Sequence, residues 1–196
     1  MKGWYFSTLD KKLRYDDNRD IAIGVTHKVD CTPVLCEIGL HLAPTILDAL
    51  EYAPGPVLWQ VVGGGEIVHG YNKSVCTERT YISGGVDISD TLRHFARLCA
   101  LDVIHLWDAP PVVVEYLKTG NESLRAAAGD AARAAGAAAK NAAWRAGRAA
   151  FAAGDAARAA GAAAWYAGRA AWHAGDADRD AQRRRLASMV VGDIIK

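Results

Sequence analysis

Alanine dominates the last third of this chain, and no proline occurs after Pro111. More than half of residues 126–177 are alanine, and the string AAGDAARAAGAAA stands at 127–139 and again at 152–164. Alanine is the strongest helix former, and the absence of proline removes the strongest helix breaker. The copies are offset by 25 residues, close to about seven helical turns, so both can present the same helical face. The tract predicts one long Ala/Gly-rich helix or a helical hairpin that bends near Lys140 and Asn141.

Heptad lettering separates this tract into a bulky face and a small-residue face. Starting the heptad at Trp144 puts large side chains in the first position and glycine in the fourth. The first positions include Trp144, Phe151, Arg158, Trp165 and Trp172, and the fourth positions are Gly147, Gly154, Gly161, Gly168 and Gly175. Small side chains let two helix backbones approach closely, and each helical glycine costs about 1 kcal/mol relative to alanine. The pattern therefore predicts self-association or partner binding through the glycine face and the aromatic/Arg ridge.

Two other roles for the aromatic ridge remain open. Tryptophan beside arginine can stack on single-stranded nucleic acid, but Asp130, Asp155 and Asp176 interrupt the basic positions, and no extended basic stripe results. The whole chain has 23 basic and 22 acidic residues and a net charge of +1, which argues against a nucleic-acid partner. The other role is a solvated spacer with exposed tryptophans. We expect a homo-oligomer or a protein partner.

The first part of the chain has a mixed composition that predicts an α+β domain over 1–118, a linker over 119–123 and the alanine-rich helical module over 124–190. Thr45 is a candidate N-cap, and Gly63, Gly64 and Gly65 are expected to end a strand. Expected strands are 4–8, 21–25, 34–35, 57–62, 66–69 and 79–82, and expected helices are 44–52 and a segment from Ser89 towards Leu106, with a short segment over 112–117 closed by Gly120. The fold class is α+β: a small mixed N-terminal domain followed by a long Ala/Gly-rich helix or helical hairpin.

Candidate chemistry gathers around Cys36 and His41. These residues could form a nucleophile and base, with Glu78 as a further acidic group, but no third group that would orient the histidine is visible. Cys31 and Cys36 with His27 and His41 could in principle hold a metal, although their spacing is not a common finger spacing. We therefore expect no metal and no cofactor, and we favour structural roles for these side chains over catalysis.

Compartment signals are absent from the sequence. The first residues contain no apolar stretch of signal-peptide length, and no apolar run is long enough to span a membrane. The four cysteines contain no CxxC pair and do not form a disulfide framework. These features predict a cytoplasmic protein that makes no membrane contact.

Several strings resemble a recurrent group of uncharacterised phage and bacterial proteins. They are LCEIGLHL (35–42), LDALEYAPGPVLWQV (47–61), GEIV (65–68), Lys73 with TERT (77–80), LRHFARLCALDVIHLWDAPPVVVEYLKTGNESLR (92–125) and the alanine array with its close at 182–186. The resemblance implies an LCxxGxH-type N-terminal domain with a repetitive alanine-rich tail, a phage-encoded origin and location in the host cytoplasm, and it implies no activity. His41 before a short helix also resembles small ADP-ribosyltransferase-like folds. That second resemblance implies the alternative function, a nucleotide- or NAD-related enzyme that uses the Cys36 and His41 region.

Overall fold

The computed structural model describes residues 1–138, 148, 151–153, 155–156, 166, 169–170, 172–173 and 179–194. The chain divides into two compact units, one formed by residues 1–88 with the end of the chain from Ala187, and the other by residues 89–186. This division falls between Ile88 and Ser89, earlier than the 118/124 boundary expected from composition. The helices after Ser89 group with the start of the alanine tract because α3 packs on both α2 and α4.

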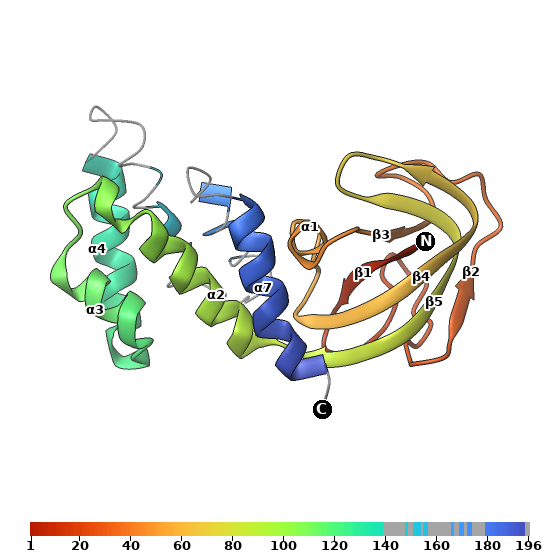
Figure 1. Ribbon diagram of the computed structural model, residues 1–196, viewed down its shortest axis with the longest axis horizontal. Helices are drawn as coiled ribbons and strands as arrows, with labels where there is room; N and C mark the ends of the chain where they lie inside the picture. Colours follow the sequence, from red (N-terminus) through yellow and green to blue (C-terminus); the bar gives the residue numbers. More distant parts are fainter. Residues whose placement is uncertain are drawn as a thin grey trace. The chain divides into compact units, whose positions relative to one another are not determined.

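The first unit is built on an antiparallel sheet with the strand order β1-β4-β5-β2 (Figure 1). Its strands are β1 (Lys2–Ser7), β2 (Thr26–Lys28), β3 (Leu40–Leu42), β4 (Val57–His69) and β5 (Ser74–Asp87). Both β2 and β3 pair with β5, at different positions along it. Ala43, just after β3, exchanges two backbone hydrogen bonds with Trp4 of β1, at 2.8 and 2.9 Å. The sheet therefore curls until the end of β3 meets β1.

The long hairpin of β4 and β5 carries the core of this unit. Trp59 and Val61 of β4 and Tyr81 of β5 are at most 2% exposed and pack with Leu42 of β3. Trp59 donates its indole N–H to Ser7 Oγ at 2.9 Å, which satisfies the polar atom of a buried ring. Hydrophobic burial of these side chains and the continuous β-ladder hold the sheet together.

The expectation that the glycine run ends a strand is wrong. β4 continues through Gly63, Gly64 and Gly65 to His69, with a register shift against β5 after Gly64. Gly65 has φ +67, and a Cβ on Gly63 would lie 3.2 Å from both Cys76 Sγ and a Leu42 methyl carbon. The glycines therefore form an irregular, closely packed stretch inside the strand, as in a β-bulge.

Other local expectations have mixed outcomes. Thr45 caps α1 (Ile46–Leu50), because its Oγ1 accepts the Asp48 N–H at 3.1 Å. The strand expected at 21–25 lies instead at 26–28, and residue 34 forms only an isolated bridge with Ile38. Buried Ile21 shows why the apolar run misleads: it packs in the core from a loop.

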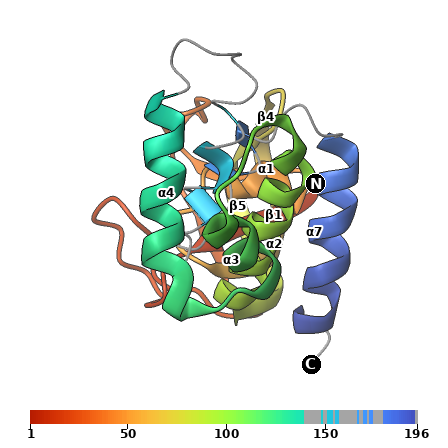
Figure 2. The same cartoon turned by 90° about the vertical axis from the view of Figure 1, so that its left-hand side faces the viewer.

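The second unit begins with a set of short helices (Figure 2). They are α2 (Ser89–Asp102), η1 (Ile104–Leu106), α3 (Pro111–Thr119), η2 (Glu122–Leu124) and α4 (Arg125–Ala138). The last described helix, α7 (Arg179–Ile194), belongs to this unit up to Leu186 and to the first unit from Ala187. Gly120 ends α3 in the left-handed region with φ +68, as the sequence predicts. Phe95 of α2 and Tyr116 of α3 are at most 1% exposed, and so are Ala128 and Ala132 of α4. Alanine in α4 thus contributes to a packed helical interface within this unit.

Candidate functional site

A pocket of about 660 Å³ lies within the first unit. Its walls come from β1, from the loop before β2, from the segment 36–43, and from two basic side chains, Lys73 and Arg79. The curl of the sheet produces this arrangement, because it brings the end of β3 against β1. A volume in this range is typical of sites for small organic molecules.

Arg79 is only 2% exposed and is the most deeply buried charged residue of the pocket lining. We call its position the floor of the pocket. It stands on β5, where it donates to the Tyr81 hydroxyl through Nε at 3.1 Å and Nη2 at 2.7 Å, and through Nη1 to the His41 carbonyl at 2.5 Å. Its guanidinium lies 3.7 Å from the centroid of the Tyr5 ring. These contacts fix the cation in place by hydrogen bonds and a cation–π interaction.

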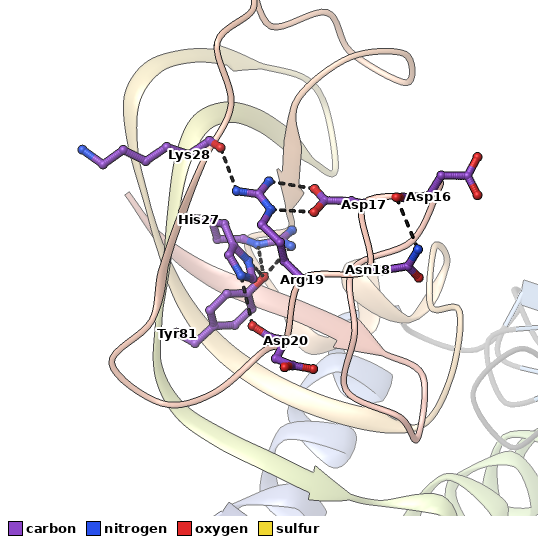
Figure 3. Close-up of polar contacts among 9 residues, drawn as sticks. Asp16, Asp17, Asn18, Arg19, Asp20, His27, Lys28 and Tyr81 are labelled. Atoms are coloured by element: carbon purple, nitrogen blue, oxygen red, sulfur yellow. Dashed lines mark hydrogen bonds and ion pairs between the residues drawn. The ribbon is translucent and has the colours of Figure 1, made fainter.

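Behind Arg79, a chain of hydrogen bonds runs through Tyr81 and His27 (Figure 3). The Tyr81 oxygen lies 3.1 Å from His27 Nδ1, and His27 Nε2 lies 3.1 Å from the Asp20 carbonyl oxygen. A carbonyl can only accept, so His27 Nε2 carries the proton and Nδ1 accepts from the Tyr81 hydroxyl. Burial and the charge of Arg19 lower the pKa of His27, and burial raises the pKa of Tyr81 against the influence of Arg79. Both side chains are therefore neutral at pH 7, and neither offsets the charge of Arg79.

The charged side chains that line the pocket are unevenly matched. Within the described part of the chain, Arg14, Lys73 and Arg79 have no carboxylate partner. The first two lie near aromatic rings instead: the Arg14 guanidinium carbon is 5.3 Å from the centroid of the Tyr15 ring, and Lys73 Nζ is 3.8 Å from the centroid of the Tyr52 ring. Asp17, an acidic residue of the lining, is engaged by Arg19 at 2.5 and 2.7 Å (Figure 3). The bond from Arg19 lowers the pKa of Asp17, whose negative charge is thus held by its own partner. Glu37, which is exposed, is the other acidic residue of the lining. The lining therefore has three cations against two carboxylates, one of which is held by Arg19.

His41 and Cys36, which the sequence singles out together, both line this pocket. The hydrogen bond between them joins the Cys36 backbone N–H to His41 Nε2 at 3.1 Å and does not involve the thiol. Burial first, and then the charges of Lys73 and Arg79, lower the pKa of His41. The ring is neutral, and its Nε2 lone pair is occupied by a backbone amide, so this geometry does not make His41 a base for the Cys36 thiol.

Glu78, the third residue of the catalytic alternative, is not among the pocket's lining residues. It pairs with Lys28 of the neighbouring strand at 2.7 Å. Glu78 is adjacent to Arg79 on β5, and successive strand residues point to opposite faces. The structure therefore brings Cys36 and His41 together at the pocket but leaves Glu78 outside it.

The metal alternative has no support in the described geometry. Among residues that the structure describes, no group of three or more His, Cys, Asp or Glu side chains could hold a metal ion. His27 is engaged by Tyr81 and Asp20, and His41 by Cys36. Cys36 is exposed and Cys31 half-buried, whereas Cys76 and Cys99 are buried thiols; burial raises the pKa of Cys99 to about 12.

Most of the heptad positions predicted to form an interaction face lie outside the described residues. These are Trp144, Arg158, Trp165, Gly147, Gly154, Gly161, Gly168 and Gly175. Phe151 and Trp172 are described and are 42% and 59% exposed. The centroid of the His173 ring lies 5.6 Å from that of the Phe151 ring and 4.8 Å from that of the Trp172 ring.

Contacts within the alanine tract run in opposite directions along two segments. Arg148 donates to the Trp172 carbonyl at 2.5 Å, and Arg169 donates to buried Asp155 at 3.0 Å. Arg148 and Trp172 are 24 residues apart, and one continuous helix would separate them by about 36 Å. Arg148 and Trp172 are therefore much closer than one straight helix would place them, and the contacts of 148 with 172 and of 155 with 169 have an antiparallel order.

Arg79, Lys73 and Tyr15 are pocket residues that sequence reasoning missed. Arg79 and Lys73 stand in strings that carry the family resemblance, but neither string has the spacing of a known anion-binding motif. Arg79 stands between Glu78 and Thr80, a polar setting that does not predict burial. It is buried because β5 pairs on both edges, and a buried cation needs a charge partner.

Fold and site together define a two-unit α+β protein whose first unit holds a positively charged pocket. Comparison of the chain with protein families, with characterised proteins and with solved structures gave no match. None of the helices in the described ranges combines the length and the apolar character needed to cross a membrane.

Proposed function

We propose that the first unit binds a small organic anion in the pocket floored by Arg79. The observation that carries this proposal is the surplus charge: Arg79 is 2% exposed, and no described carboxylate pairs with it. Buried charges in proteins are normally paired, because leaving water is costly for an ion. A bound anion would supply the missing partner.

The hydrogen-bonding capacity of Arg79 supports the same proposal. A guanidinium has five N–H donors, and the three bonds to Tyr81 and His41 use only part of them. The remaining donors suit the oxygens of a carboxylate or phosphate. Lys73 and Arg14, which are more exposed, add positive charge nearer the mouth of the pocket. This charge would steer an anion towards the floor.

Titration calorimetry of the full chain with pyrophosphate and with citrate tests the proposal. We expect at least one of these anions to bind, and Lys73→Gln to weaken that binding about fivefold, because one unpaired lining charge is lost. Lys28→Gln is the matched control, since Lys28 lies outside the pocket and pairs with Glu78. Absence of binding by both anions, or an equal loss in the two variants, would contradict the proposal.

For the alternative function, a nucleotide- or NAD-related enzyme, the structure supports a ligand site near Cys36 and His41 but gives no support to their catalytic roles. Cys36 and His41 line the pocket, which supports ligand binding there. The engagement of His41 Nε2 by a backbone amide and the separate pairing of Glu78 give no support to acid–base or nucleophilic roles. We therefore propose binding and derive no reaction.

As a second function we propose self-association through the second unit, with another copy of the chain as partner. Exposed Phe151 and Trp172 favour it, because these two large aromatic side chains are 42% and 59% exposed and both rings contact His173. Sedimentation velocity should give a larger species at high protein concentration. The double variant Phe151→Ser/Trp172→Ser should shift it to monomer, whereas Tyr71→Ser, which changes an exposed ring in the first unit, should not. A monomer at all concentrations would contradict this function.

A further inference from the structure

We propose that Tyr15 is a stacking residue at the mouth of the pocket and that the bound anion is a nucleotide, with its phosphate towards Arg79 and its base on the Tyr15 ring. This inference rests on the proposed anion-binding function and names the class of ligand. Tyr15 lines the pocket and is 91% exposed, so its ring is available to a ligand.

The backbone at Tyr15 supports a functional role for this side chain. Tyr15 has φ +61, and Asp16 and Asn18 in the same loop have φ +66 and +54. Asn and Asp tolerate this left-handed region comparatively well, whereas a bulky aromatic residue there is uncommon. Residues held in such conformations concentrate at ligand-binding sites, where the surrounding structure enforces them. No buried contact of the Tyr15 ring accounts for its conformation, since the ring is almost fully exposed.

The loop that presents Tyr15 is anchored on both sides. The Leu13 N–H donates to the Arg19 carbonyl at 2.9 Å, and the Leu13 side chain is buried in the core. Arg19 holds Asp17 with two bonds and reaches the Lys28 carbonyl at 3.0 Å (Figure 3). Because these contacts close the loop at its base, little ordering of the loop is required when a ligand binds, which favours affinity.

The residues around Tyr15 match the two chemical parts of a nucleotide. Arg14 lies 5.3 Å from the Tyr15 ring centroid, and one face of an aromatic ring can take a cation while the other stacks on a base. Lys73 and Arg79, which are both less exposed than Tyr15, supply charge for a phosphate. An inorganic or aliphatic anion would use the charged floor but leave the exposed ring without a partner.

Paired titrations of the full chain with AMP and ribose 5-phosphate test this inference, because the two ligands share the sugar phosphate and differ by the base. AMP should bind at least fivefold more tightly than ribose 5-phosphate. Tyr15→Ala should remove that preference, and Tyr15→Phe should keep it. Tyr15→Gly should also remove the preference for AMP. Because glycine adopts a positive φ without strain, this variant tests the loss of the ring without backbone strain in the loop. Tyr71→Ala is the control, since Tyr71 is 99% exposed and does not line the pocket.

Failure of this inference is distinguishable from failure of the proposed function. Equal affinities for AMP and ribose 5-phosphate would overturn the nucleotide assignment while leaving anion binding in place. A preference for AMP that persists in Tyr15→Ala and Tyr15→Gly would overturn the role of Tyr15. Absence of binding by AMP, ribose 5-phosphate, pyrophosphate and citrate would overturn both.

Discussion

Replacing Arg79 with methionine is expected to lower the affinity of the pocket for its anion by at least about 100-fold. Methionine keeps an unbranched apolar side chain at this buried position. It removes the charge, the guanidinium contact with the Tyr5 ring and all three hydrogen bonds to Tyr81 and His41. The effect is larger than that of Lys73→Gln because Arg79 is only 2% exposed. Charge interactions are stronger where water is excluded. Titration calorimetry with the tightest-binding anion gives the measurement.

The same variant has a readout that needs no ligand. Arg79 is one of two cations whose charge lowers the pKa of His41, although burial is the larger cause. Removing Arg79 should therefore raise the pKa of His41 towards its ordinary value, as followed by the chemical shifts of the imidazole ring during a pH titration. If the pKa of His41 does not move, the guanidinium does not face the histidine as the structure places it.

Arg125→Met is the matched control for net charge. Arg125 belongs to the second unit. Its side chain is 43% exposed and pairs with Glu122 at 2.9 Å. The Arg125→Met substitution removes one positive charge from the chain, as Arg79→Met does, and changes no residue that lines the pocket. Equal losses of anion affinity in the two variants would contradict a specific role for Arg79 and would point to a general effect of net charge.

Local signals predicted those elements whose determinants lie close together in the sequence. Thr45 and Asp48 form a cap within a single turn, and Gly120 ends α3 through its own backbone conformation. The glycine run at 63–65 failed as a strand terminator because its conformation is set by neighbours distant in the sequence. Cys76 and Leu42 approach Gly63 too closely for a larger side chain to fit without adjustment. Tertiary contacts override the local turn signal there.

The candidate site was only partly accessible from the sequence for the same reason. Cys36 and His41 are five residues apart, so their proximity could be predicted, and both line the pocket. Whether the thiol or the backbone amide meets the imidazole depends on the turn at Cys36, which has φ +70. The importance of Arg79 depends on which groups face it from β1, β2 and β3. No local pattern encodes the lack of a carboxylate among them.

The alanine tract illustrates a different limit. Its composition predicts helix, but the partner of each small face is a tertiary property. Ala152, Ala153 and Ala156 are at most 2% exposed, and the Tyr116 hydroxyl donates to the Ala156 carbonyl at 3.4 Å. Alanine in this segment is therefore used at least in part for packing inside the second unit. The proposed self-association would therefore use side chains that are exposed in this unit, such as Phe151 and Trp172.

Gly39→Ala is expected to destabilise the protein by about 3 kcal/mol and to weaken anion binding. Gly39 has φ +116, and a Cβ there would lie 2.6 Å from a Val75 methyl carbon, 3.3 Å from the Cys76 carbonyl oxygen and 3.4 Å from Pro33 Cβ. Alanine would thus combine an unfavourable backbone conformation with a collision against β5. Because Gly39 directly precedes β3 and lines the pocket beside His41, the adjustment would also displace the pocket wall.

Gly24→Ala separates the two contributions and completes this experiment. Gly24 has φ +84, but a Cβ there would meet nothing within 4 Å. We therefore expect Gly24→Ala to lower the free energy of unfolding by about 1 kcal/mol, through the unfavourable backbone conformation alone. Urea unfolding of both variants and the unsubstituted protein gives the two free energies. A loss in Gly39→Ala no larger than that in Gly24→Ala would mean that Gly39 does not pack against Val75. A clearly larger loss, accompanied by weaker anion binding in Gly39→Ala alone, would link the close approach of β3 and β5 to the shape of the pocket.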